Sequence, residues 1–325
     1  MRAMVIRDKA LVLEDRPEPV PGKGEVRVRV HASAVNRADL IQIMGGYPAP
    51  PDAVADVPGL EYAGVVDAVG PGVYTRKEGD RVFGLVGGGA YSESIVVHAE
   101  TTSTLPENIP FTEAAALPEA YLTAYDAMVV QMGLAAGETV LVHAVGSGVG
   151  TAAVQIARVI GARTIGTARS QDKLDDATAL GLGTAVLPED GKFADAVLAA
   201  TNGRGVDVVL ELVGGSYVPE SIACLAPRGR LVLVGLLAGA RADVDLGAVL
   251  RKRLTIRGTV MRSRPLDEKI AAARVLDRHL APLFAEGRLS AVIHRVMPLA
   301  EANEALALVG KNEGFGKVVL DCAPS

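Results

Sequence analysis

Five residues near the middle of the chain, Gly146-Ser-Gly-Val-Gly150, have the types and spacing of a turn that binds phosphate. A run suited to a buried strand, Val140–Val145, leads into this turn, and a helical pattern that ends at Gly161 follows it. In the order strand, Gly-x-Gly-x-Gly, helix, the backbone comes close to a pyrophosphate and the anion lies at a helix N-terminus. The sequence therefore predicts a bound dinucleotide.

The residues around the turn support this interpretation, because a glycine motif needs a strand–helix context. Five more strand-like runs follow, at Thr164–Ala168, Ala185–Leu187, Val206–Leu212, Arg230–Gly235 and Leu254–Val260. Strands that alternate with helical stretches are typical of a parallel sheet covered by helices. We expect an α/β fold with a doubly wound, Rossmann-type parallel sheet over residues 121–261. A glycine-punctuated turn that binds nothing is the alternative.

The end of the second strand indicates which dinucleotide is bound. In NAD-binding proteins an acidic residue about twenty positions beyond the glycines binds the ribose 2′-hydroxyl. Here the nineteenth residue after Gly150 is Arg169, followed by Ser170 as a predicted N-cap and by Lys173 at the third helical position. Arg169, Ser170 and Lys173 form a coherent clamp for a 2′-phosphate, so we expect NADPH. A solvated charge cluster balanced by Asp172 would suit NAD equally well.

The two ends of the chain differ in pattern from this central part. The first hundred residues show short alternating runs, such as Glu25–Val30, between clusters of proline and glycine, which is typical of short strands and turns. A helical segment over Thr112–Met132, bent at Pro118, leads into the dinucleotide unit.

The segment after residue 261 contains a helical pattern, Leu266–Glu286, and then the order strand, helix, strand. We expect residues 262–325 to fold back onto residues 1–120 as one β-rich domain.

Composition and charge exclude several classes of protein. The chain has 325 residues, 49% of them hydrophobic, which supports a packed core, and a net charge of −5, which argues against nucleic acid or an anionic membrane as a partner. No apolar run approaches the ~20 residues of a membrane span, and no signal peptide is evident at the N-terminus. The two cysteines, Cys224 and Cys322, suit a reducing compartment, so we expect a cytoplasmic protein.

Several motifs together resemble the zinc-independent quinone oxidoreductase branch of the medium-chain dehydrogenase/reductase superfamily. The motifs are Asn36-Arg-Ala-Asp39, Glu61-Tyr-Ala-Gly64, Gly79-Asp-Arg-Val82, His143–Gly150 and Gly314–Leu320. The resemblance covers nearly the whole chain and implies a GroES-like catalytic domain joined to a Rossmann domain. It also implies a homodimer formed through the sixth strands, which correspond to Leu254–Val260 here.

The resemblance also implies positions for the cofactor and for the catalytic groups. NADPH would lie on Ser147, Gly148, Val149, Gly150, Ser170 and Lys173, with the nicotinamide near Thr123, Val213, Gly235 and Lys317. Asn36, Asp39 and Tyr47 would face the nicotinamide pocket from the β-rich domain. Pro188 stands where many relatives place a tyrosine against the adenine, so the adenine contacts differ here.

Alcohol-oxidising relatives use zinc as a Lewis acid, with cysteine, histidine and glutamate ligands. At the matching positions this chain has Asn36 for the cysteine and Leu60 for the histidine that precedes Glu61. The five histidines are scattered without metal-ligand spacing, and we expect no metal. Metal-free hydride transfer suits quinones and α,β-unsaturated carbonyls, because their developing negative charge spreads over a conjugated system.

Three side chains are expected to act on the acceptor. The amide of Asn36 and the hydroxyls of Tyr47 and Ser147 are the predicted donors to the forming oxyanion, with the proton supplied by water or by Tyr47. Each residue also has a structural alternative. Asn36 could cap a turn with its amide, Tyr47 could pack its ring against a loop, and Ser147 could be a small residue that the glycine turn tolerates. We expect Asp39 to be structural, bound by Arg37 or by backbone.

The leading hypothesis is therefore an NADPH-dependent quinone reductase with a small-molecule quinone or enone substrate. An enoyl or alkenal reductase is the nearest alternative. If its substrates were CoA thioesters, Arg262, Arg264 and residues 251–253 could supply a basic patch. The third hypothesis is a non-catalytic protein that senses nucleotides.

Overall fold

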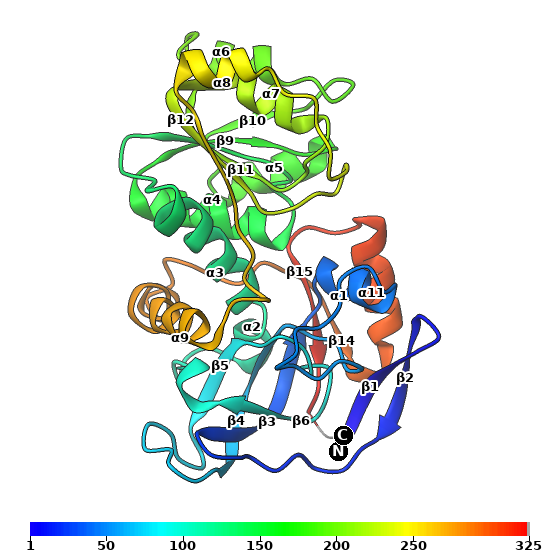
Figure 1. Ribbon diagram of the computed structural model, residues 1–325. Coiled ribbons are helices and arrows are strands. Elements are labelled where there is room, and N and C mark those ends of the chain that lie inside the picture. The colour runs from blue at the N-terminus through cyan, green and yellow to red at the C-terminus, as the bar shows by residue number, and fades with distance from the viewer. Residues whose placement is uncertain (324–325) are drawn as a thin grey trace. The chain divides into compact units, whose positions relative to one another are not determined.

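The computed structural model describes residues 1–323, and the chain divides into two compact units. The first, here called the β-rich unit, comprises residues 1–122 and the segment from Met261 onward. The second, here called the parallel-sheet unit, comprises Thr123–Val260. Both units are drawn in Figure 1. Within residues 1–323, no helix has the length and apolar character that crossing a membrane requires.

The parallel-sheet unit contains six strands that all run in the same direction. The strands are β8 (Thr139–Val142), β9 (Arg163–Thr167), β10 (Thr184–Val186), β11 (Val206–Glu211), β12 (Leu225–Leu233) and β13 (Thr255–Gly258). Their order in the sheet is β10-β9-β8-β11-β12-β13. The chain runs outward from β8 to β10 and then crosses to β11, so a topological switch point lies between β8 and β11. Open α/β sheets bind ligands at the carboxyl ends of the strands at such a point.

Five helices cover the two faces of this sheet. They are α4 (Gly148–Ile160), α5 (Gln171–Leu180), α6 (Ala194–Ala200), α7 (Tyr217–Cys224) and α8 (Leu246–Lys252). The helices α4 and α5 pack on one face, and α6, α7 and α8 lie on the other (Figure 1). Because both faces are covered, the inner strands are almost entirely apolar, and Leu141, Leu210 and Leu231 have no exposed surface.

The β-rich unit is built around a seven-stranded sheet with a separate hairpin. Its strands are β1 (Arg2–Arg7), β2 (Ala10–Asp15), β3 (Glu25–Ala34), β4 (Glu61–Val69), β5 (Arg81–Leu85), β6 (Ser94–His98), β7 (Thr102–Thr104), β14 (Ile293–Pro298) and β15 (Lys317–Asp321). The sheet order is β14-β15-β3-β4-β5-β7, β6 also pairs with β3, and β1 and β2 form the hairpin. The strand β15 pairs antiparallel with β3, which brings the C-terminal segment onto the N-terminal one.

Short helices connect these strands. They are α1 (Arg37–Ile43), α2 (Phe111–Ala114), α3 (Pro118–Tyr125), α9 (Leu266–Val275), α10 (Ala281–Ala285) and α11 (Ala302–Lys311), with 3-10 turns η1 (Ala99–Thr101) and η4 (Leu299–Glu301) and the π segment η3 (Leu276–Leu280). Residues 123–125 of α3 and a second π segment, η2 (Asp126–Gln131), belong to the parallel-sheet unit. The core beneath them includes Val26, Val28, Tyr62 and Val82, all without exposed surface.

Element boundaries differ from the sequence expectations where the backbone turns or changes its helical type. The strand β8 ends at Val142 instead of residue 145, because Ala144 adopts a left-handed conformation with φ of 48°. The expected helix over residues 112–132 is divided into α2, α3 and η2, and the one over residues 266–286 is divided by η3. The helix α3 begins at Pro118, where the sequence predicted a bend. The changes to η2 and η3 were not predictable, because periodicity in the sequence does not distinguish α from π segments.

Candidate functional site

The glycine turn joins β8 to α4 at the carboxyl end of an inner strand. Ser147 is the N-cap of α4, and its Oγ accepts a hydrogen bond from the Gly150 amide at 3.0 Å. A Cβ at residue 150 would lie 2.3 Å from the Ala144 carbonyl oxygen, so only glycine fits there. The N-terminus of α4, with Gly148 and Val149, therefore lies at the switch point, where its amides favour an anion.

Two cations lie where β9 leads into α5. Ser170 is the N-cap residue of α5, as expected, but its side chain makes no capping hydrogen bond. Lys173 is the third residue of the helix. Burial lowers the pKa of the Lys173 ammonium, and the nearby Arg169 cation lowers it further. Because the two cations repel each other, an anionic group beside them would be stabilised, so these residues fit a phosphate.

The loops after β11 and β12 bring Val213 and Gly235 to the same edge of the sheet. The amide of Val213 donates to Glu211 Oε1 at 2.8 Å, and the amide of Gly235 donates to the Glu211 carbonyl at 3.2 Å. A Cβ on residue 235 would lie 2.4 Å from the Leu212 carbonyl oxygen, so the close approach of the two loops requires glycine. Thr123, also assigned to the nicotinamide from the sequence, is buried in α3.

A buried ion pair in the β-rich unit holds Asn36 and Lys317 together. The ammonium of Lys317 lies 2.7 Å from Glu61 Oε1, and it donates to Asn36 Oδ1 at 2.6 Å and to the Val35 carbonyl at 3.0 Å. Asn36 Nδ2 donates to Glu61 Oε1 at 2.9 Å and to the Ala34 carbonyl at 3.2 Å. Both the oxygen and the nitrogen of the Asn36 amide are therefore engaged within the protein.

The other oxygen of Glu61 is also bound. Its Oε2 accepts the backbone amide of Glu119 at 2.8 Å, and the Glu61 side chain has no exposed surface. An ammonium, an amide nitrogen and a backbone N–H thus satisfy this carboxylate. Across residues 1–323, no three His, Cys, Asp or Glu side chains are grouped as metal ligands would be.

Asp39 is a second buried carboxylate close to Asn36. It accepts hydrogen bonds from the Asn36 amide at 2.8 Å, the Gly59 amide at 3.2 Å and the Tyr91 hydroxyl at 2.9 Å. Burial raises the pKa of Asp39 to about 6, although these donors act in the opposite direction. The backbone contacts agree with the structural role expected for Asp39, whereas the bond to Tyr91 was not expected.

Arg262 holds the loop that carries Tyr47. Its guanidinium donates to the Tyr47 carbonyl at 3.2 Å, to the Gly87 carbonyl at 2.8 Å and to Gln42 Oε1 at 2.6 Å. It also lies 5.0 Å from the centre of the Tyr47 ring. Arg262 is only 6% exposed, so this residue of the expected basic patch points into the protein. Burial raises the pKa of the Tyr47 hydroxyl.

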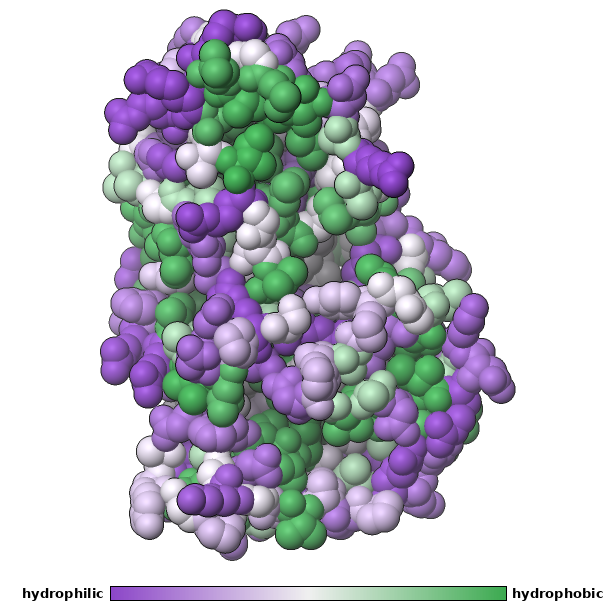
Figure 2. Space-filling model, in the orientation of Figure 1, coloured by the Kyte–Doolittle hydropathy of each residue, from purple (hydrophilic) through white to green (hydrophobic). Residues whose placement is uncertain are grey.

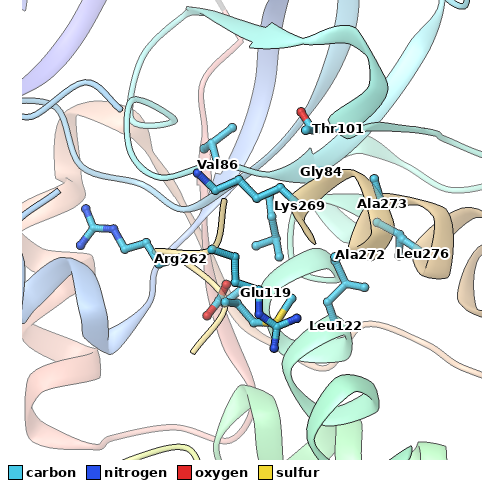
Figure 3. Close-up of a pocket in the computed structure, with 13 residues that line it drawn as sticks. Gly84, Val86, Thr101, Glu119, Leu122, Arg262, Lys269, Ala272, Ala273 and Leu276 are labelled. Atoms are coloured by element: carbon cyan, nitrogen blue, oxygen red, sulfur yellow. The ribbon is translucent and has the colours of Figure 1, made fainter. Parts of the chain in front are cut away.

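A hollow of about 470 Å³, open to solvent, lies in the β-rich unit (Figure 3). Leu122, Ala272 and Leu276 form part of its wall, and Glu119 and Lys269 bring polar atoms to it. The side chain of Arg262 extends away from the other residues labelled in Figure 3. The hollow therefore combines apolar walls with a few polar groups, as small-molecule pockets do.

Sequence reasoning missed a buried set of polar side chains in the parallel-sheet unit. His143, Glu211 and Ser221 have no exposed surface and Thr167 is 1% exposed. The sequence signals were a histidine directly before the glycine turn and a glutamate at the end of an apolar strand. Neither signal reveals Ser221, which lies 78 residues from His143 in the chain.

Two protein-family models match the chain. Residues 22–107 match the alcohol dehydrogenase GroES-like domain, and residues 148–277 match the zinc-binding dehydrogenase family. Quinone oxidoreductase-like protein 2 of Bos taurus is 34% identical over 314 residues, which cover 96% of this chain and 89% of that protein. The phthioceranic/hydroxyphthioceranic acid synthase of Mycobacterium bovis is 34% identical over 305 residues, which cover 92% of this chain but only 14% of the synthase.

Solved structures of dehydrogenases and reductases are also similar to this chain. An NAD-dependent alcohol dehydrogenase matches with a TM-score of 0.87 and 34% identity over 99% of this chain and 100% of that chain. The Escherichia coli quinone oxidoreductase complexed with NADPH matches with a TM-score of 0.87 and 28% identity, over 98% of each chain. The chain belongs to the medium-chain dehydrogenase/reductase superfamily, as an oxidoreductase whose fold binds a nicotinamide cofactor. The fold class and the family expected from the sequence are confirmed.

Proposed function

We propose that this protein is an NADPH-dependent oxidoreductase that reduces quinones without a metal ion. The observation that carries the proposal is the state of Glu61, the one carboxylate at the positions where zinc-dependent relatives bind their metal. Lys317, Asn36 and a backbone amide take up its oxygens. An ammonium thus supplies the positive charge at this place, and a metal ion would have to displace it.

The preference for NADPH rests on the cations after β9. Arg169 and Lys173 repel each other, and a 2′-phosphate beside them would make charge-assisted hydrogen bonds with both. Ser170 would add its hydroxyl, which makes no capping bond. The likeness to the NADPH complex of the Escherichia coli enzyme supports this choice, whereas the likeness to an NAD-dependent alcohol dehydrogenase favours NAD.

The acceptor must stabilise its own negative charge, because the proposed site has no Lewis acid. The bound nicotinamide supplies a hydride, and a quinone or an enone spreads the resulting charge over its conjugated system. Tyr47 is the proposed proton donor, since its phenol is protonated at neutral pH, although burial raises its pKa and makes it a weaker acid. Asn36 and Ser147 are proposed to orient the acceptor and the cofactor, with Asn36 itself oriented by Lys317.

The hollow in Figure 3 is the proposed place for the acceptor's ring. Its apolar wall suits a flat hydrophobic ring, and Met261 and Leu122 contribute to this wall. Proximity and orientation in such a pocket supply much of the rate of a hydride transfer.

A panel of acceptors tests the proposal. Initial rates of NADPH oxidation would be compared for 1,4-benzoquinone, 1,2-naphthoquinone and 9,10-phenanthrenequinone, and for 2-alkenals and crotonyl-CoA. We expect the highest kcat/KM with a quinone, unchanged by a chelator. Intact NADPH binding with no turnover of any quinone would contradict the proposal.

Reduction of activated C=C bonds is the second candidate function. The likeness to a segment of the phthioceranic/hydroxyphthioceranic acid synthase supports it. For CoA thioesters, the burial of Arg262 removes one of the cations that would face the CoA phosphates. A kcat/KM for crotonyl-CoA or 2-hexenal above that for every quinone would select this function.

A further inference from the structure

Four buried side chains in the parallel-sheet unit form one continuous chain of hydrogen bonds. Thr167 Oγ1 lies 2.8 Å from His143 Nδ1, and His143 Nε2 lies 2.9 Å from Ser221 Oγ. The Ser221 hydroxyl donates to Glu211 Oε2 at 2.9 Å. The other oxygen of Glu211 accepts the backbone amides of Val213 at 2.8 Å and Gly214 at 2.9 Å.

One end of this chain fixes the direction of every hydrogen bond in it. The Ser221 hydroxyl donates its single proton to Glu211 Oε2, so Ser221 Oγ must accept from His143 Nε2. His143 is therefore protonated on Nε2, and its Nδ1 accepts from the Thr167 hydroxyl. Burial lowers the pKa of His143, although the Glu211 charge opposes this, so the ring is neutral. Phe193 and Tyr217 pack edge-on against the ring at 4.8 and 5.1 Å and exclude water.

The chain runs across the carboxyl ends of three adjacent strands. Thr167 is the last residue of β9, His143 directly follows β8, and Glu211 is the last residue of β11. The loops that leave these ends carry Arg169, the glycine turn and Val213. The hydrogen-bonded chain of side chains thus connects the starting points of these three loops at the switch point.

We infer that Ser221, His143 and Thr167 are positioning residues that act through Glu211 to hold the Val213–Gly214 loop in the shape that receives the nicotinamide end of the cofactor. The inference rests on the proposed function for the position of the nicotinamide. Gly214 and Gly215 have φ of 71° and 52°. Two successive glycines have many conformations open to them, so the loop needs external bonds. The segment around Gly239 supplies two, from the Gly215 amide to the Gly239 carbonyl and from the Ala238 amide to the Val213 carbonyl, and Glu211 supplies those to the amides of Val213 and Gly214.

The loss of the Ser221 hydroxyl should act at one end of the cofactor only. In Ser221→Ala, Glu211 Oε2 would lose its hydroxyl donor and keep only the more distant His143 Nε2, at 3.5 Å, so the buried carboxylate would be less well solvated and the loop it holds would loosen. The loop after β9, with Arg169 and Lys173, starts at the opposite end of the chain and keeps its own bond between Thr167 and His143. The nicotinamide end should therefore be affected and the 2′-phosphate end should not.

Binding measurements on the full-length protein separate the two ends. Dissociation constants for NADPH, NADH and 2′,5′-ADP would be measured by calorimetry for the wild type and Ser221→Ala. In Ser221→Ala we expect the affinity for the reduced cofactor, NADPH or NADH, to fall about tenfold, which is the equivalent of one charge-assisted hydrogen bond. The affinity for 2′,5′-ADP should change less than about twofold. Val197→Ala is the matched control, because it opens the core of the same unit under α6. It should lower Tm without changing the ratio of the two affinities.

A spectroscopic measurement checks the direction of the hydrogen bonds. The ¹⁵N shifts of the His143 ring, assigned by comparison with His143→Asn, should report a protonated Nε2 and an unprotonated Nδ1. An equal loss of affinity for NADPH and 2′,5′-ADP, or the opposite tautomer in the wild type, would overturn the inference. A different result would contradict the proposed function and leave this inference in place, namely that NADH binds as tightly as NADPH.

Discussion

Lys317 and Glu61 carry opposite charges in a place that water does not reach. The side chains are 6% and 0% exposed, and the pair shares Asn36 as a third partner. Removing one member of such a pair leaves an uncompensated buried charge, whereas removing both does not. The pair is therefore best tested through the coupling between its members.

We predict that Glu61→Gln and Lys317→Met each lower the free energy of unfolding by about 3–5 kcal/mol. The double variant should lose less free energy of unfolding than the two single variants lose together, because neither buried charge remains. Urea denaturation of the four proteins gives the coupling energy. Strict additivity would show that the two charges do not interact.

Asp39 makes stability depend on pH in an uncommon direction. Its pKa in the folded protein is about 6, above the ordinary value of 3.8, so the folded chain binds this proton more tightly than the unfolded chain. The stabilisation from Asp39 is present in full below about pH 4 and is lost as the pH rises through 6. Relative to Asp39→Asn, the wild type should lose about 2.4 kcal/mol between pH 4 and 7. Parallel stability profiles would refute the raised pKa.

The cations at Arg169 and Lys173 are predicted to select the cofactor. Arg169→Ala combined with Lys173→Ala should raise KM for NADPH by roughly 100-fold, since each lost charge-assisted bond contributes about 1.5–3 kcal/mol. KM for NADH should change little, and Lys23→Ala, an exposed cation of the β-rich unit, should leave both values unchanged. A parallel loss for both cofactors would show that the cations act on something other than the 2′-phosphate.

At the scale of elements, the junction of β8 with α4 determines where the phosphates can lie. The helix begins directly over the turn, and the Ala144 carbonyl occupies the space where a side chain at residue 150 would be. Sequence predicted this junction well, because strand, glycines and helix are consecutive in the chain. It did not predict the partners of Asn36 or Glu211, because Lys317 and Ser221 are brought to them by the pairing and packing of distant elements.

Gly150→Ala should displace α4 and weaken the binding of the reduced cofactor by at least about 100-fold, because its Cβ would meet backbone atoms that cannot move aside. Gly310→Ala is the matched control. Gly310 lies in α11, where its Cβ would be 3.5 Å from Leu40 Cδ2 of α1, and the substitution should stabilise the protein by about 0.5–1 kcal/mol. Cofactor binding followed by fluorescence and unfolding followed by circular dichroism measure the two effects. Unchanged affinity in Gly150→Ala would contradict the geometry of the turn.

At the scale of the whole molecule, β13 is an edge strand whose four residues are all exposed. Nearby, Leu246 and Leu250 of α8 are 75% and 77% exposed. Figure 2 shows hydrophobic residues gathered over the region where Figure 1 labels α8. Exposed edges and apolar patches of this kind are common association surfaces. The sequence indicated the strand, and the resemblance implied a dimer through it. Its place at the edge of the sheet is consistent with that pairing.

We predict a homodimer joined through β13. Ile256→Glu would place two carboxylates near each other across the two-fold axis and should give a monomer, because like charges on paired strands repel. Tyr74→Glu, at a side chain that is 94% exposed in the β-rich unit, is the control and should leave the dimer intact. Sedimentation velocity distinguishes the two species. A wild-type monomer at micromolar concentration would refute this assembly.

The most direct measurement of the central claim is kcat/KM for NADPH and for NADH with 9,10-phenanthrenequinone, in the presence of excess chelator. We expect rapid reduction of the quinone that the chelator does not change. NADPH should be preferred over NADH by roughly 100-fold because of Arg169 and Lys173. Equal use of NADH, or loss of activity that only added zinc restores, would contradict the central claim.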